Sequence, residues 1–147
     1  MEKIAIASDH GGFELKEILI GYLFTKELEV IDCGTDSSES VDYPEYAEKV
    51  ARMVATGEVD RGILICGTGI GMSIAANRIK GVRCTLCTSV HMAEASRKHN
   101  NSNILAMGGR TTEAIDALDI MEAWLKTEFD GGRHQRRIDK IDEIRPE

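Results

Sequence analysis

The residues with the clearest potential for chemistry lie in segment 62–71, GILICGTGIG. Its apolar start predicts a buried strand that ends at the thiol of Cys66. Three glycines follow at alternate positions: Gly67, Gly69 and Gly71. Residues 70–78 have the pattern of a helix, so free backbone N–H groups at a helix N-terminus would surround the thiol and the nearby hydroxyl of Thr68. Such a place attracts negative charge and favours the thiolate, which predicts a site that forms and stabilises an oxyanion.

This glycine loop differs from the common nucleotide-binding loops. Its glycines are separated by single residues, whereas the dinucleotide fingerprint has two residues between its last two glycines. In addition, no acidic residue ends the following strand, residues 82–87. The lysine of a P-loop is also missing. A simple tight turn is the remaining alternative, because glycine is common between a strand and a helix.

A second candidate is segment 130–137, DGGRHQRR, where a helix is expected to begin near Arg133. Arg133 and Arg137 would share one face of that helix, although like charges at this spacing repel and cations oppose the dipole there. The arrangement makes sense if a dianion binds between the guanidinium groups, which match phosphate oxygens. The alternative is a solvated basic patch that three acidic neighbours balance: Glu128, Asp130 and Asp139.

A third polar cluster contains His99 and Asn100. A histidine at this point can cap the C-terminus of a helix, but its place relative to Cys66 is informative. It precedes the strand expected at residues 103–107 and so lies at the opposite edge of the sheet, and such a strand spans about 17–20 Å. If both side chains serve one substrate, His99 must come from a second subunit, which predicts a homodimer with shared sites.

The expected first strand ends at Asp9 and His10, and two glycines follow. A titratable pair at the edge of a sheet suits ligand contact, while a cap on the first helix is an equal alternative for Asp9. Arg110 follows the last strand at the same edge. Tyr43, which precedes a proline, is a weaker candidate.

Strands and helices alternate along the chain, and the strands are nearly continuous apolar runs. This order predicts a parallel sheet with helices on both faces, in which ligands bind at the carboxyl ends of the strands. We expect a five-stranded, Rossmann-like three-layer αβα sandwich with strands at residues 3–8, 28–32, 62–66, 82–87 and 103–107. The expected helices are residues 13–26, 46–56, 70–78, 89–98, 113–127 and one from about 133.

Apolar spacing assigns the inner faces of the first and last helices. On or near the inner face of the first helix we expect Phe13, Ile18, Leu19 and Leu23. From the last helix we expect three isoleucines to point inward: Ile138, Ile141 and Ile144.

Composition narrows the possible functions. At 147 residues with 42% apolar content, the chain is expected to form one domain, residues 1–147. A net charge of −7 argues against nucleic acid or an anionic membrane as partner. No apolar stretch has the length of a membrane span and no secretory signal is recognisable, so a cytoplasmic location is expected.

Three of the four cysteines are expected to be buried and structural: Cys33, Cys84 and Cys87. Cys84 and Cys87 have the spacing of a zinc pair. Residues three apart on a strand face opposite ways, however, so both sulfurs cannot bind one ion. No metal site is expected.

Five segments, in this order, resemble the ribose-5-phosphate isomerase B family, which includes the galactose-6-phosphate and allose-6-phosphate isomerases. They are residues 8–11 (SDHG), 41–44 (VDYP), 65–71 (ICGTGIG), 97–100 (RKHN) and 131–134 (GGRH). The resemblance spans essentially the whole chain. Its most specific parts are the glycine loop with its cysteine and the GGRH segment.

The resemblance implies an aldose–ketose isomerase of the pentose phosphate pathway, which interconverts ribose 5-phosphate and ribulose 5-phosphate without a metal or an organic cofactor. Cys66 would be the base that moves a proton between C2 and C1 through an enediol(ate). The backbone of residues 67–71, including Ile70, would hold the oxyanion together with Thr68. His99, helped by Asp9, would open the furanose ring.

The resemblance also assigns the remaining contacts with the phosphorylated sugar. The phosphate would be held by His10, Arg110, Arg133 and Arg137, and the sugar would contact Tyr43 and Asn100. Relatives form dimers, sometimes tetramers, with sites at the subunit boundary. Three alternatives stay open: a six-carbon sugar phosphate as substrate, a non-catalytic phosphosugar-binding module, and a thiol hydrolase, for which only His10 lies at the right edge.

Overall fold

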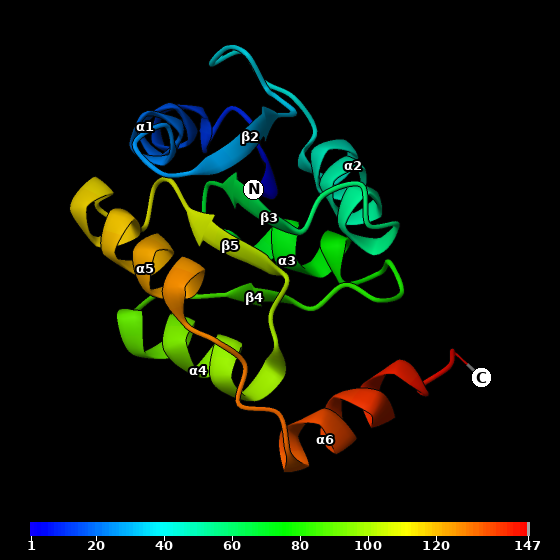
Figure 1. Cartoon of the computed structure of the whole chain (residues 1–147). Helices are drawn as coiled ribbons and strands as arrows, with labels where there is room; N and C mark the ends of the chain where they lie inside the picture. The colour runs from blue at the N-terminus through cyan, green and yellow to red at the C-terminus, as the bar shows by residue number, and fades with distance from the viewer. Residues whose placement is uncertain (147) are drawn as a thin grey trace.

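The computed structural model of the chain describes residues 1–146. Within this range five strands and six helices alternate (Figure 1). The strands are β1 (Glu2–Ser8), β2 (Leu28–Asp32), β3 (Arg61–Cys66), β4 (Cys84–Leu86) and β5 (Ile104–Gly108). The helices are α1 (Phe13–Leu23), α2 (Tyr43–Ala55), α3 (Ile70–Ala76), α4 (Val90–Asn100), α5 (Ala114–Lys126) and α6 (Arg133–Asp142). None of these described helices combines the length and the apolar character that crossing a bilayer demands.

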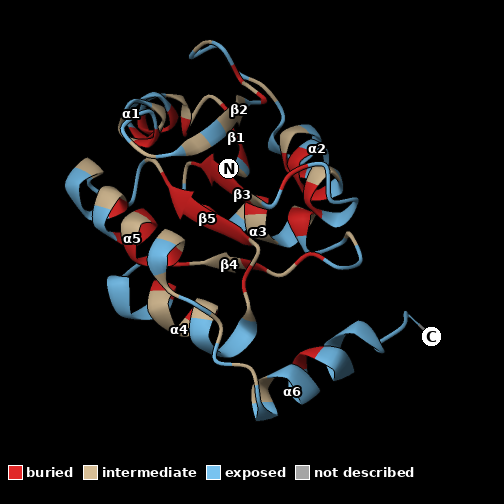
Figure 2. Cartoon of the chain, viewed as in Figure 1, coloured by how far each residue is buried: buried red, intermediate tan, exposed pale blue. Residues whose placement is uncertain are grey.

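The strands form one parallel sheet in the order β2-β1-β3-β5-β4. Helices α1, α4 and α5 pack on one face, and α2 and α3 pack on the other. Figure 2 shows the buried sheet between these two helical layers. The predicted three-layer αβα sandwich is confirmed.

Alternate residues of each strand feed two separate cores. In β3, Ile63 and Ile65 belong to the core beneath α1 and α5, whereas Leu64 belongs to the core beneath α2 and α3. Cys84 and Cys87 also fall into different cores, as the strand periodicity predicted. They therefore do not form a zinc pair.

The chain reverses direction across the sheet between β1 and β3, because β2 lies on one side of β1 and β3 on the other. In open α/β sheets the crevice at such a switch point, at the carboxyl ends of the strands, is the usual place for a ligand. Asp9 and His10 follow β1, and Cys66 ends β3. The fold thus brings these two predicted clusters to one edge.

Helices α1 and α2 differ from the expectation in their details. Helix α2 begins at Tyr43 rather than Tyr46, since Pro44 suits the first turn of a helix. In α1, Ile18 is 46% exposed, so its predicted inner position is wrong, whereas Lys16 is fully buried. The buried ammonium of Lys16 is compensated by Asp32, with 2.9 Å between Nζ and Oδ2.

Helix α6 departs most from the prediction. Ile138 is buried, but Ile141 and Ile144 are 49% and 76% exposed, so their expected inward orientation is wrong within one chain. Figure 1 shows α6 beyond α4 at the periphery, with no sheet behind it. Ile141 on α6 and Ile144 beyond its end therefore remain largely outside the core of this chain.

Candidate active site

Cys66 lies at the carboxyl end of β3 with only 5% of its surface exposed. The backbone N–H of Gly69 donates a hydrogen bond to its Sγ at 3.2 Å. The backbone at Gly69 is left-handed, with a φ of 81°. A Cβ there would also lie 2.6 Å from Leu86 Cδ1 and 2.8 Å from the carbonyl carbon of Met107. Only glycine therefore fits this position.

The loop that follows Cys66 is fastened to the end of β5. The N–H of Gly109 donates to the carbonyl of Cys66 at 2.8 Å, and the N–H of Arg110 donates to the carbonyl of Gly67 at 2.9 Å. The guanidinium of Arg110 lies beside the loop, since a Cβ on Gly67 would be 3.5 Å from its Nη1. A cation thus lies next to the donors of the glycine loop.

Asp9 is buried at the start of α1, and its Oδ1 accepts the N–H of Gly12 at 3.2 Å. It therefore does contact the backbone at a helix start, which was one of its two predicted roles. Its carboxylate also borders the glycine loop, because a Cβ on Gly11 would lie 3.3 Å from Asp9 Oδ1 and 3.1 Å from the nitrogen of Gly67.

His10 has a defined ring orientation. Its Nδ1 accepts the backbone N–H of Val41 at 3.2 Å. Because Nδ1 is the acceptor, Nε2 carries the proton in the neutral ring and can donate to an anion.

Thr68 and Tyr43 complete this side of the site. Thr68 is exposed, and its Oγ1 accepts the N–H of Ile70 at 3.2 Å, at the start of α3. The Tyr43 ring covers Gly71, where a Cβ would lie 2.6 Å from the ring carbons. We call this group the Cys66 half-site: Asp9, His10, Tyr43, residues 66–71 and Arg110.

The remaining predicted residues gather elsewhere in the chain. His99 and Asn100 lie in the last turn of α4, and Arg133 and Arg137 lie on α6. We call these four residues the His99 half-site. The structure adds one residue that the sequence analysis left without a role: the ring of His134 stacks on His99, with 4.7 Å between centroids and 23° between planes. Its place in the GGRH segment, directly after Arg133, was the available signal.

The two arginines of the His99 half-site, Arg133 and Arg137, are not paired with acidic side chains in the described part of the chain. Asp139 instead accepts a hydrogen bond from Gln135 at 2.8 Å. Partial desolvation, together with the charges of His99 and the two arginines, lowers the pKa of His134. This is a surface that favours an anion.

The two half-sites of one chain lie at opposite edges of the sheet. Cys66 pairs with Gly108 at the end of β5, whereas His99 precedes the start of β5. The five residues of β5 span about 16 Å. In Figure 1 the β5 arrow points away from α6. The separation that the sequence predicted is confirmed.

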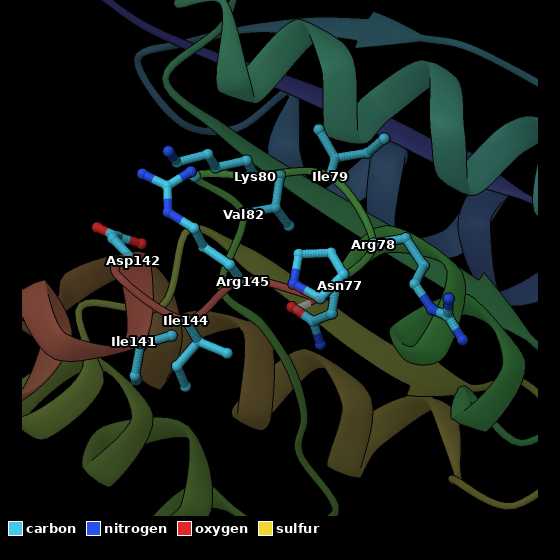
Figure 3. Close-up of a pocket in the computed structure, with 11 residues that line it drawn as sticks. Asn77, Arg78, Ile79, Lys80, Val82, Ile141, Asp142, Ile144 and Arg145 are labelled. Carbon is cyan, nitrogen blue, oxygen red and sulfur yellow. The ribbon is translucent and has the colours of Figure 1, made fainter.

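A hollow of about 500 Å³ lies near the amino ends of the strands, on the side of α6. Figure 3 shows Ile141 and Ile144 on one side of it, with Lys80 and Val82 on the other. No residue of the Cys66 half-site lines it. This hollow is therefore separate from the site around the thiol.

The other three cysteines are free and buried: Cys33, Cys84 and Cys87. Burial raises the pKa of each of these thiols. They pack in the two cores, so their predicted burial is confirmed.

One group has the ligand types of a transition-metal site. The ring nitrogens of His99 and His134 and a carboxylate oxygen of Asp130 lie within 4.8 Å of one another. The two rings are stacked, however, so their nitrogens would have to turn before they could converge on one ion.

Comparisons with known proteins agree with this architecture. The family described as Ribose/Galactose Isomerase matches residues 4–141. Ribose-5-phosphate isomerase B of Escherichia coli is 51% identical over 144 residues, which cover 98% of this chain and 97% of the relative.

Solved structures are equally similar. Ribose-5-phosphate isomerase B of Clostridium thermocellum has a TM-score of 0.95 at 55% identity, and the match covers 97% of this chain and 96% of that one. The Mycoplasma genitalium enzyme, solved with bound ribulose-5-phosphate, has a TM-score of 0.93 at 44% identity over 96% and 94% of the two chains. On its sheet order, its glycine loop and these matches along nearly its whole length, the chain belongs to the ribose/galactose isomerase family.

Proposed function

We propose that the protein interconverts ribose 5-phosphate and ribulose 5-phosphate as a single sugar-phosphate isomerase domain. The observation that carries this proposal is the hydrogen bond from Gly69 N–H to Cys66 Sγ, 3.2 Å long, in a loop of backbone donors beside Arg110. It joins a basic sulfur to groups that stabilise an oxyanion. The relatives named above carry the same activity in their names.

The reaction needs one proton to move between neighbouring carbons. In the open-chain aldose, the Cys66 thiolate takes the hydrogen of C2, and the electron pair moves to the carbonyl oxygen to give an enediolate. The N–H groups of residues 67–71 and the hydroxyl of Thr68 stabilise that oxygen. The thiol then returns the proton to C1, and the hydroxyl proton of C2 shifts to the former carbonyl oxygen. No electron enters or leaves, so the reaction requires no redox cofactor.

The furanose form must first open. We assign this step to His99, which protonates the ring oxygen while Asp9 accepts the proton of the C1 hydroxyl. Imidazole suits this task because its ordinary pKa lies near neutrality. Tyr43 and Asn100 contact the sugar hydroxyls.

The phosphate is held by cations from both half-sites. His10 and Arg110 approach from the Cys66 half-site, and Arg133 and Arg137 from the His99 half-site. Guanidinium groups bind phosphate oxygens in pairs, which gives orientation as well as affinity. Fixing the phosphate supplies part of the barrier reduction, because it places C2 near the sulfur.

A complete site then requires two chains. The half-sites of one subunit lie at opposite edges of the sheet, so His99, Asn100, Arg133 and Arg137 reach Cys66 from a second copy. The exposed Ile141 and Ile144 support this arrangement, since a partner would cover them. We propose a homodimer with two shared sites; pairing of dimers into a tetramer would require further surface to be buried.

We also place the enzyme in the cytoplasm. The four cysteines are free, which suits a reducing compartment. Detection of the protein in the soluble cytoplasmic fraction of its source cells would test this assignment.

The direct test of function is an incubation of the purified protein with ribose 5-phosphate in EDTA. We expect ribulose 5-phosphate to form, and chelation to leave the rate unchanged. Allose 6-phosphate and galactose 6-phosphate in parallel assays separate a five-carbon from a six-carbon preference. Binding of all three sugars without turnover would identify a non-catalytic phosphosugar-binding module instead.

A further inference from the structure

We infer that His134 is a positioning residue, which holds the imidazole of His99 in the orientation needed to protonate the sugar ring oxygen. This inference rests on the proposed function, in which His99 opens the furanose ring. It assigns a role to the one ring in contact with His99 that the proposed reaction leaves unused. His134 itself would touch neither the reacting atoms nor the base.

The stack is the geometric basis of the inference. His99 is exposed in the last turn of α4, where its ring would otherwise turn freely about two side-chain bonds. His134 lies against it with 4.7 Å between centroids and 23° between planes, which is an offset stacked arrangement. A stacked neighbour limits the ring to one plane and leaves its edge nitrogens free to donate.

The backbone around His134 is held firmly enough to act as a support. The N–H of Asp130 donates to the carbonyl of Lys98 at 3.1 Å, which ties the segment before α6 to the last turn of α4. The N–H of His134 donates to the carbonyl of Gly131, also at 3.1 Å. Ile138, one turn further along α6, is buried. The support therefore comes from the same subunit as His99.

Charge favours a division of roles between the two rings. Two imidazolium ions at this separation would repel each other, so the pair holds one proton more easily than two. His134 already faces His99, Arg133 and Arg137, and these neighbours favour its neutral form. A carboxylate oxygen of Asp130 lies within 4.8 Å of a ring nitrogen of each histidine, so one negative charge borders the pair.

The test exploits the acyclic form of the ketose. Ribulose 5-phosphate cannot close to a furanose because its C5 oxygen carries the phosphate. Exchange of its C1 hydrogen with D₂O therefore needs Cys66 but no ring opening. Net conversion of ribose 5-phosphate needs both steps. The ratio of exchange to conversion isolates ring opening from proton transfer and from phosphate binding.

We propose to measure both rates, by NMR and by a coupled assay, in His134→Ala, His134→Phe and the neighbouring control Gln135→Ala. His134→Ala should convert ribose 5-phosphate about tenfold more slowly while C1 exchange stays within about twofold of the parent, because only ring orientation is lost. His134→Phe retains a stacking ring and should recover most of the conversion. Gln135→Ala should match the parent in both rates.

Three results would overturn the inference. Equal losses of exchange and conversion in His134→Ala would place His134 in phosphate binding or assembly. A His134→Phe variant as slow as His134→Ala would mean that the ring nitrogens act directly. Conversion that EDTA abolishes and Zn²⁺ restores would make the cluster with Asp130 a metal site. If the parent protein neither exchanges nor converts, the proposed function itself fails, which is a separate outcome.

Discussion

The Cys66 half-site and the His99 half-site are built in opposite ways. In the first, Cys66 and Asp9 are buried, and backbone hydrogen bonds at the ends of three strands hold the loop: Asp9 N–H to Ile65, Gly109 N–H to Cys66 and Arg110 N–H to Gly67. The second consists of exposed side chains from the last turn of α4 and the first half of α6. The contrast matches the chemistry that we assign to each. Proton abstraction from carbon depends on hydrogen-bond donors that are already in position around the developing oxyanion. Binding a phosphate can be done by longer and more mobile side chains.

The largest effect should follow from Cys66→Ala. The variant should fold and bind the sugar phosphate, because the thiol makes one backbone contact and fills little volume. Hydrogen exchange at C2 of ribose 5-phosphate with D₂O should fall by at least about a thousandfold, since no other base lies in the loop. Cys84→Ala is the matched control for loss of a buried thiol and should keep its activity. Parent-like exchange in Cys66→Ala would remove this sulfur from the mechanism.

The next effect separates the two half-sites. His99→Ala should slow net conversion of ribose 5-phosphate by about a hundredfold, a typical loss for a general acid. Exchange of the C1 hydrogen of ribulose 5-phosphate should survive, because that ketose needs no ring opening. Loss of both rates to the same degree would contradict the division of labour between the half-sites.

A smaller effect is expected from the cations of α6. Arg133→Ala and Arg137→Ala should each raise KM for ribose 5-phosphate about tenfold, which corresponds to roughly 1.4 kcal/mol of phosphate binding, with a lesser change in kcat. Arg136→Ala, on the same exposed helix, is the control and should leave KM unchanged. An equal rise in all three variants would indicate general surface charge rather than a defined phosphate site.

A further prediction concerns the backbone of the glycine loop and is measured as stability rather than activity. Gly69 and Gly81 both have left-handed backbones, with φ of 81° and 90°, but only Gly69 is crowded. Gly81→Ala should lower the free energy of unfolding by about 1 kcal/mol from backbone strain alone. Gly69→Ala should cost about 2–4 kcal/mol, because contact with Leu86 and Met107 adds to the strain. Denaturant unfolding compares the two, and equal losses would show that the loop can relax.

The order of the elements could be predicted from the sequence because each strand is a continuous apolar run and the turns carry glycine. The position of Cys66 at the carboxyl edge of the sheet could be inferred because all strands were expected to be parallel. The separation of His99 from Cys66 also followed, since it depends only on strand length. These inferences use only the spacing of apolar residues, the order of the elements along the chain and the length of a strand, all of which can be counted in the sequence.

Side-chain partners were harder to predict. Lys16 is a charged residue in a helix, and only the fold brings Asp32 to its ammonium. Ile141 and Ile144 have the spacing of core residues, yet a single chain offers them no core. His134 stacks on His99, which lies on the neighbouring helix α4, and no spacing rule predicts a stack between α4 and α6. Each of these depends on contacts between different elements of the fold or, for Ile141 and Ile144, on the second subunit that we propose.

Subunit complementation tests most directly whether one site is made by two chains. Cys66→Ala and His99→Ala proteins, each nearly inactive alone, would be unfolded, mixed in equal amounts and refolded together. Random pairing makes half of the dimers mixed, and each mixed dimer contains one site with both groups intact, so roughly a quarter of parental activity should return. If the mixture recovers no more than the sum of the separately refolded variants, both groups act within one chain and the shared site is wrong.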